Sequence, residues 1–215
     1  TTTELMNNIE KKYVHDTYQL IASDFDTTRT YLWQGVKVFL DSIEKNSIIL
    51  EIGSGNGKNL LKRQDCINIG IDLCSNFCKI STEKGIESIV GNNLKLPILD
   101  NIADYVLSIA VIHHLTTEER RFQCIKEIIR VLKPKGKFII QVWSLKQPEK
   151  SRRKFIEQDN FVDFISSDKK TKESRFYHVF LENELENLLL KLDNINIIST
   201  YWELGNYIVI GQKKF

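Results

Sequence analysis

The sequence is poor in proline and cysteine, and it contains no long apolar run. Only 3 prolines and 4 cysteines occur among its 215 residues. No apolar run approaches the roughly 18 residues that a membrane-spanning helix needs. The N-terminal residues, Thr1 to Glu10, also lack the apolar block of a secretory signal peptide. These absences exclude a membrane protein and predict a cytoplasmic one, with the nucleus as a further location.

The cysteines provide neither a metal site nor a redox pair. They form no Cys-x-x-Cys pair and no zinc-ligand spacing, and they stand at Cys66, Cys74, Cys78 and Cys124. We therefore expect buried thiols in a reducing compartment and predict no metal site.

Positive and negative charges are nearly balanced. Lysine and arginine number 30 and aspartate and glutamate 28, which gives a formal net charge of +2. This balance excludes a uniformly basic nucleic-acid coat, although a local basic patch is compatible with it. The length suits one domain with a substantial core and is too short for two.

What the sequence does contain is an alternation of helical and strand periods. Residues 14–25 and 31–43 carry apolar side chains at helical spacing, as do residues 118–133. Continuously apolar segments separate such stretches, and we expect strands at 48–52, 67–73, 86–90, 103–110 and 137–143. Strands of this kind indicate a parallel sheet that is covered by helices on both faces.

The C-terminal part of the chain departs from this alternation of parallel strands and helices. A helix is expected at 182–192, and the strand candidates 195–203 and 207–212 are joined through Leu204-Gly205-Asn206. So short a connection implies an antiparallel pair. A parallel α/β sheet that finishes in an antiparallel hairpin resembles the seven-stranded class I methyltransferase fold, a Rossmann-like architecture. We therefore predict an α/β protein with this sheet and a C-terminal antiparallel hairpin.

A glycine-rich turn follows the first expected strand. Gly53, Gly55 and Gly57 have the spacing G-x-G-x-G and not the G-x-G-x-x-G of dinucleotide folds. Glycine allows a tight turn and lets a ligand approach the backbone closely. Many strand-to-helix turns need glycine, so the turn alone does not identify a ligand.

Hydrogen-bond acceptors at the ends of successive strands strengthen this prediction. Asp72 can accept hydrogen bonds from both hydroxyls of a ribose, with capping of the helix at Ser75 as the alternative. Asn92 stands where the methyltransferase superfamily usually has Asp, and its carbonyl oxygen can still accept from an adenine amino group. Glu51 matches the superfamily's acidic position at the methionine end of the cofactor. We predict S-adenosylmethionine as the cofactor, bound by Glu51, Gly53, Ser54, Gly55, Asp72, Asn92, Asn93, Leu94 and Ala110.

The segment after the fourth strand restricts the methyl acceptor. Residues 110–115 read Ala-Val-Ile-His-His-Leu. Amino-directed methyltransferases carry Asn/Asp-Pro-Pro-aromatic here, so methylation of an adenine or cytosine amine is disfavoured. A Pro-Cys pair for covalent attack on a pyrimidine ring is also absent, and an oxygen acceptor is the remaining default.

Three blocks of residues carry a resemblance that covers nearly the whole chain. They are Tyr13-Val14-His15-Asp16-x-Tyr18 with Ile21-Ala22, Phe25 and Thr28-Arg29; Ser108 to His114 with Glu119-Arg120-Arg121; and Arg175-x-Tyr177-His178 with Glu184-Leu185. With these blocks the chain resembles the eukaryotic tRNA wobble-uridine carboxymethyl methyltransferases. It departs from that family at Asp24, where His is common, and at Ser54, where Cys is common.

The resemblance implies a reaction. Members of the family esterify 5-carboxymethyluridine at the first anticodon position, so we expect a tRNA O-methyltransferase that forms the methyl ester. The substrate carboxylate, with a reference pKa near ~4, is already ionised at neutral pH and needs no general base. Arg29 is our first choice to clamp it bidentately. The predicted catalytic residues are Arg29, His114, Tyr177 and His178, while His113 is expected to be a packed core residue.

Two partners are predicted. Basic residues are expected to bind phosphates of the tRNA around its anticodon loop, or else to be merely solvated; they are Lys150, Arg152, Arg153, Lys154 and Arg175. The resemblance also implies a heterodimer with a small zinc-binding activator that several methyltransferases share. The open edge strand at 86–90 could accept it by β-augmentation.

Within the single domain, 1–215, we distinguish four parts. They are the N-terminal helices (1–46), a cofactor-binding core (47–143), a basic insertion (144–178) and a C-terminal helix with the hairpin (179–215). Two other functions stay open: a small-molecule O-methyltransferase of the same fold and a non-catalytic methyltransferase-like subunit. The first needs an apolar acceptor pocket, which the polar segment 144–175 does not suggest. The second is at odds with the intact cofactor residues.

Overall fold

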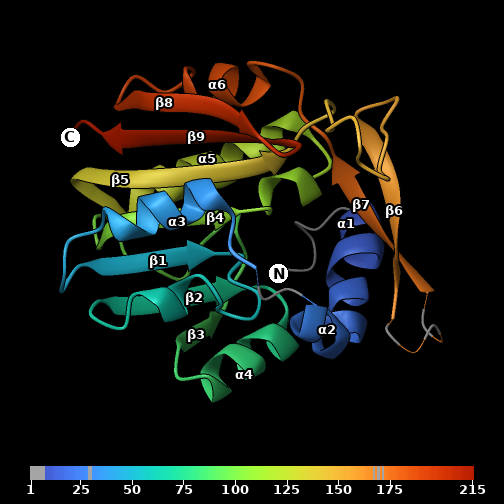
Figure 1. The fold of residues 1–215 in the computed structure, drawn as a ribbon. Helices are drawn as coiled ribbons and strands as arrows, with labels where there is room; N and C mark the ends of the chain where they lie inside the picture. The colour runs from blue at the N-terminus through green and yellow to red at the C-terminus, as the bar shows by residue number, and fades with distance from the viewer. Residues whose placement is uncertain (1–7, 29–30, 167, 169, 171) are drawn as a thin grey trace.

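The centre of the molecule is a mixed seven-stranded sheet with the strand order β3-β2-β1-β4-β5-β9-β8 (Figure 1). The computed structural model describes residues 8–28, 31–166, 168, 170 and 172–215. The strands of this sheet are β1 (Ile48–Ile52), β2 (Ile67–Asp72), β3 (Glu87–Val90), β4 (Ala103–Ile109), β5 (Leu132–Trp143), β8 (Ile195–Glu203) and β9 (Asn206–Lys213).

The strand directions confirm the predicted fold class. β1 pairs in parallel with β2 and β4, β2 with β3, and β4 with β5. β9 lies antiparallel between β5 and β8. The turn between β8 and β9 contains Leu204 and Gly205, both with a positive φ. This left-handed backbone is what a tight hairpin turn requires.

Helices cover both faces of the sheet. The side chains of each strand alternate between the faces, so that Ile49 joins an apolar cluster with α3 and Leu50 joins one with α5 and α6. The helical elements are α1 (Asn8–Glu10), the π-helical η2 (Lys11–Asp16), α2 (Thr17–Thr28), α3 (Gln34–Asp41), the 3₁₀ turns η3 (Leu60–Lys62) and η4 (Ile112–His114), α4 (Ser75–Glu83), α5 (Glu118–Val131) and α6 (Glu184–Leu189).

One boundary differs from the prediction. The helical pattern at 118–133 predicts a helix stop at Pro134, but α5 ends at Val131 and β5 begins directly at Leu132. The pairing of β4 with β5 shifts between the pairs Ala103–Leu132 and Tyr105–Lys137. Residues 133–136 therefore bulge out of the ladder, where a proline removes no hydrogen bond.

Segments from distant parts of the chain cover the carboxyl ends of the parallel strands. The N-terminal helical segment crosses these ends, and a separate two-stranded sheet of β6 (Asp159–Ile165) and β7 (Lys172–His178) stands beside it (Figure 1). β7 contacts η2, α2 and η4. Ligands of open α/β sheets bind beyond the carboxyl ends of the strands, so these additions enclose the expected site.

The β6–β7 hairpin lies within the segment that the sequence assigns to a basic insertion, 144–178. In β6 only Phe164 is fully buried, and its neighbours Asp163 and Ile165 are exposed. The buried part of β7 contains the polar residues Arg175 and His178 beside Phe176 and Tyr177. Neither strand therefore has an apolar period long enough to be recognised from the sequence.

Two further predictions, from the cysteine content and the lack of long apolar runs, concern buried thiols and membrane-spanning helices. Cys74, Cys78 and Cys124 are buried and Cys66 is half-buried, all as unpaired thiols. Within the described residues, no helix has the length and apolar character needed to cross a membrane.

Candidate active site

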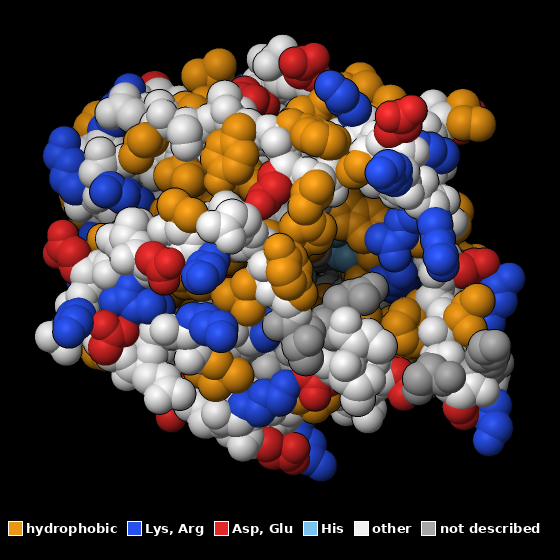
Figure 2. All heavy atoms as spheres, viewed as in Figure 1, with side chains coloured by type: hydrophobic (Ala, Val, Ile, Leu, Met, Phe, Trp, Pro, Cys, Tyr) orange, Lys and Arg blue, Asp and Glu red, His pale blue; other side chains and the backbone are white. Residues whose placement is uncertain are grey.

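A cavity of about 490 Å³ lies at the carboxyl ends of the parallel strands, a volume in the range of cofactor and small-molecule sites. The glycine turn after β1, the ends of β2 and β4, the N-terminal helices and β7 all contribute to its wall. In Figure 2 it opens as a hollow with a histidine side chain visible in its depth, and lysine and arginine side chains lie beside its mouth.

The glycine turn brings backbone to the cavity wall. Gly53 has a φ of +69°, and a Cβ there would lie 2.4 Å from Cγ2 of Val111. Gly55 has a φ of +52°, and the place of its absent Cβ is open space. Other residues are strained at such φ values. Both positions therefore need glycine for the turn, and at Gly55 the backbone is left accessible to a ligand.

Glu51 provides a buried carboxylate beside this turn. Its side chain is 1% exposed, and its Oε1 accepts a hydrogen bond of 2.5 Å from Nδ2 of Asn59. Oε2 is buried and has no hydrogen-bond partner among the described residues. Burial raises the pKa of Glu51 to about 8. A cationic group of a ligand would satisfy this oxygen and stabilise the ionised carboxylate.

Asp72 and Asn92 present acceptors at the ends of β2 and β3. Oδ2 of Asp72 accepts from the backbone N–H of Gly55 (2.8 Å), and Oδ1 accepts from that of Cys74 (2.8 Å). Burial raises the pKa of Asp72 to about 6, against the effect of these two donors. Oδ1 of Asn92 accepts from the backbone N–H of Leu94 at 2.9 Å. Each of these oxygens keeps a further lone pair for a ligand.

Together these groups fit S-adenosylmethionine. Its ammonium suits the unpartnered oxygen of Glu51, its ribose hydroxyls suit Asp72, and its adenine amine suits Asn92. The structure brings all of the predicted cofactor-binding residues together at this cavity: Glu51, Gly53, Ser54, Gly55, Asp72, Asn92, Asn93, Leu94 and Ala110.

The three motif blocks meet at the same cavity. Tyr18 comes from the first block, His114 from the second and Tyr177 from the third, and all three line the cavity. Nδ1 of His114 lies 2.7 Å from the carbonyl oxygen of Phe176, so it must donate. Nε2 then accepts from the hydroxyl of Tyr18 at 3.0 Å, and that hydroxyl lies 3.4 Å from the hydroxyl of Tyr177. Sequence reasoning gave Tyr18 no role, although its block contained it.

Both histidines at the end of β4 are buried and neutral. Burial lowers the pKa of His114 to about 3 and that of His113 well below its usual range. Nδ1 of His113 accepts from the backbone N–H of Trp143 at 3.0 Å, so its proton is on Nε2. His113 is 1% exposed, as expected of a core residue, but it also contributes to the cavity wall.

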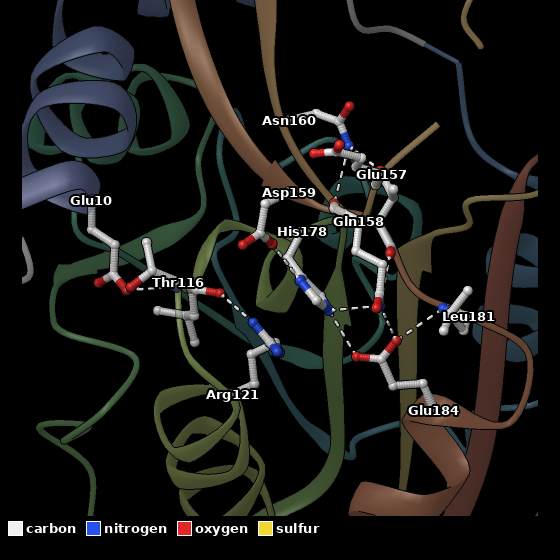
Figure 3. A network of polar contacts seen from close by, with 12 residues as sticks. Glu10, Thr116, Arg121, Glu157, Gln158, Asp159, Asn160, His178, Leu181 and Glu184 are labelled. Atoms are coloured by element: carbon white, nitrogen blue, oxygen red, sulfur yellow. Dashed lines mark hydrogen bonds and ion pairs between the residues drawn. The ribbon is translucent and has the colours of Figure 1, made fainter. Parts of the chain in front are cut away.

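His178 does not line the cavity, which contradicts its prediction as a catalytic residue. Its Nδ1 lies 2.6 Å from Oδ1 of Asp159 and its Nε2 lies 2.7 Å from Oε1 of Glu184 (Figure 3). Successive side chains of a strand point to opposite sides, so Tyr177 faces the cavity while His178 faces away from it. His178 instead joins β7 to β6 and α6.

The predicted phosphate-binding residues fall into two groups. Lys150, Arg152, Arg153 and Lys154 are exposed in the loop before β6. Arg175, in contrast, is 1% exposed and lines the cavity. The surface of a tRNA cannot reach a buried guanidinium, so the structure contradicts the prediction that Arg175 binds its backbone phosphates. Arg29, the predicted carboxylate clamp, lies outside the described residues.

Aromatic rings form one part of the cavity wall, and we call this part the aromatic wall. The rings of Trp143 and Tyr177 stack with centroids 4.1 Å apart at an angle of 6°. The guanidinium of Arg153 lies 4.6 Å from the centroid of the Trp143 ring. Arg153 thus belongs to the cavity wall as well as to the exposed loop. Such a wall suits a flat heterocyclic ligand such as a nucleobase.

A buried ion pair fixes the N-terminal helices over the site. Glu10 is 5% exposed and accepts from the backbone N–H and the hydroxyl of Thr116 at 2.8 and 2.9 Å. Its other oxygen pairs with Arg120 of α5 at 2.5 Å. These contacts hold the N-terminal helices, which line the cavity, against the loop that follows β4 and the start of α5.

Comparison with known proteins agrees with this geometry. A family model described as a methyltransferase domain matches residues 50–140. The chain is 35% identical over 225 residues to the tRNA (carboxymethyluridine(34)-5-O)-methyltransferase of Schizosaccharomyces pombe, with 95% of this chain and 97% of that relative covered.

Two longer relatives are also similar. The identity is 32% to the tRNA (carboxymethyluridine(34)-5-O)-methyltransferase alkbh8 of Xenopus tropicalis, with 96% of this chain and 42% of that relative covered. It is 44% to the tRNA (carboxymethyluridine(34)-5-O)-methyltransferase of Arabidopsis thaliana, with 66% of this chain and 35% of that relative covered. The chain thus spans less than half the length of these two relatives.

Solved structures share the fold at low sequence identity. A SAM-dependent methyltransferase from Aquifex aeolicus superposes with a TM-score of 0.66 at 18% identity, covering 91% of this chain and 98% of that one. A chain from the complex between the Haloferax volcanii Trm112 methyltransferase activator and a methyltransferase superposes with a TM-score of 0.67 at 16% identity, covering 94% and 98%.

Proposed function

The chain belongs to the tRNA (carboxymethyluridine(34)-5-O)-methyltransferase family, and we propose that it methylates the carboxylate of 5-carboxymethyluridine at the wobble position of tRNA. The observation that carries this proposal is the meeting of Tyr18, His114 and Tyr177 in one hydrogen-bonded group. These residues come from three separate family motifs, and they lie in the same cavity as the cofactor-binding turn.

The reaction needs little proton chemistry from the protein. S-adenosylmethionine, when bound, supplies the methyl group on a positively charged sulfur. Glu51, Asp72 and Asn92 would hold and orient it. The acceptor carboxylate is ionised at neutral pH, and neither neutral histidine of the cavity is needed as a base. The chain's own residues instead align the carboxylate and shield it from water, which raises its reactivity.

Transfer of a labelled methyl group tests this proposal. The full chain is incubated with labelled S-adenosylmethionine and with tRNA that carries 5-carboxymethyluridine, or with the same tRNA unmodified at that position. We expect label only in the first tRNA, and mild alkali should release it as methanol because the product is an ester. Incorporation that resists alkali, or equal incorporation into both tRNAs, would contradict the proposal.

The exposed basic loop before β6 is proposed to contact the tRNA backbone. Lys150, Arg152 and Lys154 are exposed in the loop that also brings Arg153 to the cavity wall. A side chain that neutralises a phosphate releases a counterion. Replacing Lys150 and Arg152 with Ala should therefore flatten the dependence of tRNA affinity on salt, measured by fluorescence anisotropy. An unchanged salt dependence would remove this loop from the interface.

A small activator subunit is the proposed protein partner. β3 forms one edge of the sheet, and Val90 at its end is 54% exposed. An exposed strand edge can accept a strand from another chain. The Haloferax volcanii methyltransferase that shares this fold was solved in complex with the Trm112 activator. We propose that a zinc-binding activator of this kind pairs with β3 in a heterodimer, which co-purification would test.

A further inference from the structure

Arg175 is a buried cation that no carboxylate of the described residues contacts directly. Its side chain is 1% exposed, and no carboxylate of the described residues forms an ion pair with it. Aromatic rings surround it instead: its guanidinium lies between 5.3 and 6.0 Å from the ring centroids of Tyr18, Phe25, Phe164 and Tyr177. Burying a charge without an anionic partner is costly.

A second buried arginine shows the contrast. Arg121 of α5 is 5% exposed, but the carboxylates of Glu184, Asp159, Glu118 and Glu119 act on it electrostatically. Arg121 therefore has its counter-charges within the protein. On Arg175, in contrast, only Asp163 is named as an acting carboxylate, and Asp163 is itself paired with Lys172 at 3.0 Å. The direction in which Arg175 can meet a further anion is the cavity that it lines.

The hydrogen bonds around Arg175 have one consistent direction. Its Nη1 donates to the hydroxyl of Tyr177 at 2.8 Å. The hydroxyl of Tyr177 can then donate to that of Tyr18, and Tyr18 donates to His114, whose Nδ1 donates to a backbone carbonyl. Each hydrogen bond in this series is donated in the direction away from Arg175. The guanidinium is thus held in place while Nε, which is buried, has no acceptor among the described residues.

A group that offers only donors and a positive charge selects a ligand that offers only acceptors and a negative charge. A guanidinium binds a carboxylate with parallel hydrogen bonds. We propose that Arg175 binds the carboxylate of 5-carboxymethyluridine and thereby selects the acceptor, an assignment that rests on the proposed function. Arg175 then acts on the substrate inside the cavity and not on the tRNA backbone.

The charge change during the reaction agrees with this role. The bond between the methyl carbon and the cofactor sulfur breaks, its electron pair stays on sulfur, and a carboxylate oxygen forms the new bond to carbon. A cation and an anion thus become a thioether and an ester, both neutral, and no proton is released. Because the ester has lost its negative charge, it loses the ion pair with Arg175. The same contact that recognises the substrate therefore favours release of the product.

A substrate pair that differs only in charge tests this proposal. Two anticodon stem-loop RNAs carry either 5-carboxymethyluridine or its neutral amide, 5-carbamoylmethyluridine, at the wobble position. Their dissociation constants are measured with the full chain saturated with S-adenosylhomocysteine. The wild-type chain should prefer the carboxylate RNA by about tenfold or more, as expected for hydrogen bonds between charged groups. Arg175→Gln should abolish this preference and bind the amide RNA as the wild type does.

Further variants separate recognition from folding. Arg175→Lys keeps the charge but not the planar pair of donors, so it should retain part of the preference. Arg121→Gln, a buried arginine outside the cavity, should retain all of it. Affinity for S-adenosylhomocysteine, measured by calorimetry, should be equal in all variants and shows that each is folded.

The outcomes distinguish this proposal from the proposed function. If Arg175→Gln still prefers the carboxylate, Arg175 is not its receptor, although the reaction itself stands. If the variant binds both RNAs equally weakly and with a flatter salt dependence, Arg175 contacts phosphate and the proposal is overturned. If the wild-type chain prefers neither RNA and transfers no methyl group, the proposed function fails as well.

Discussion

Burial acts in opposite directions on the acidic and the imidazole side chains around the cavity. It raises the pKa of Glu51 to about 8 and that of Asp72 to about 6, while it lowers the pKa of His114 to about 3. Near neutral pH the ligand-free chain therefore has a largely protonated Glu51, an ionised Asp72 and neutral His113 and His114. Binding of a cationic ligand group beside Glu51 would release its proton.

The pH dependence of stability measures the burial of Glu51. Its folded-state pKa of about 8 lies above the ordinary value of 4.5, so the folded chain holds a proton that the unfolded chain has lost. This stabilisation is fully present below pH 4.5 and is lost as the pH rises through 8. It should lower the free energy of unfolding by about 2–3 kcal/mol between pH 6 and 8.5. The neutral His113 and His114 gain stability over the same pH range, so the loss due to Glu51 is measured as the difference between the wild type and Glu51→Gln in urea unfolding at the two pH values.

Glu51→Gln should remove this component, because an amide does not titrate, so its free energy of unfolding should change less unfavourably than that of the wild type between pH 6 and 8.5. Glu149→Gln, at an exposed loop position, should leave it unchanged and serves as the control. If the Glu51→Gln chain showed the same decrease as the wild type, the titrating group would be another one.

For some residues of the site the position at the cavity could be predicted from the sequence, and for others it could not. Gly53, Asp72 and Asn92 stand at or just after the ends of predicted strands, and parallel strands bring their ends together, so local patterns sufficed to predict that these residues meet at one cavity. Arg175 and His178 could not be assigned correctly, because their faces depend on the strand β7, which was not recognised. With β7 identified, alternation would have grouped Arg175 with Tyr177 at the cavity and turned His178 away.

At the scale of elements, the strands between helices were predictable and the additions to the fold were not. The central strands β1 and β4 have mostly apolar runs that a sheet covered on both faces buries. The hairpin β6–β7 gains its stability from contacts with η2, α2 and η4. Such contacts join residues far apart in the chain, so they cannot be predicted from the local sequence pattern of residues 144–178.

The two edges of the sheet provide a matched test of the activator interface. Val90 at the end of β3 and Ile198 on β8 are each 54% exposed. Val90→Lys should reduce co-purification of a zinc-binding activator, since a lysine on an edge strand opposes pairing with another strand. Ile198→Lys, on the opposite edge, should leave co-purification unchanged. Equal loss in both variants, or in neither, would place the partner elsewhere.

At the scale of the whole molecule, charge is arranged locally. The net charge is only +2, so attraction of a tRNA cannot come from the chain as a whole. The exposed cations of residues 150–154 lie in a loop whose Arg153 also contacts the aromatic wall of the cavity. Under the proposed function, this one segment would combine long-range attraction of the tRNA with binding of one base, and the buried Arg175 would bind the acceptor group.

The whole reaction should therefore be nearly independent of pH once both substrates are bound. The acceptor carboxylate is ionised well below neutral pH, and His114, with a pKa of about 3, is engaged by Tyr18 and a backbone carbonyl. With tRNA and S-adenosylmethionine saturating, kcat should change by less than about twofold between pH 6.5 and 8.5, as no proton is transferred. A tenfold rise for each pH unit would reveal a general base and contradict this mechanism. The KM for S-adenosylmethionine should instead fall as the pH rises through about 8, because Glu51 must lose its proton to pair with the ammonium group, and Glu51→Gln should remove that dependence.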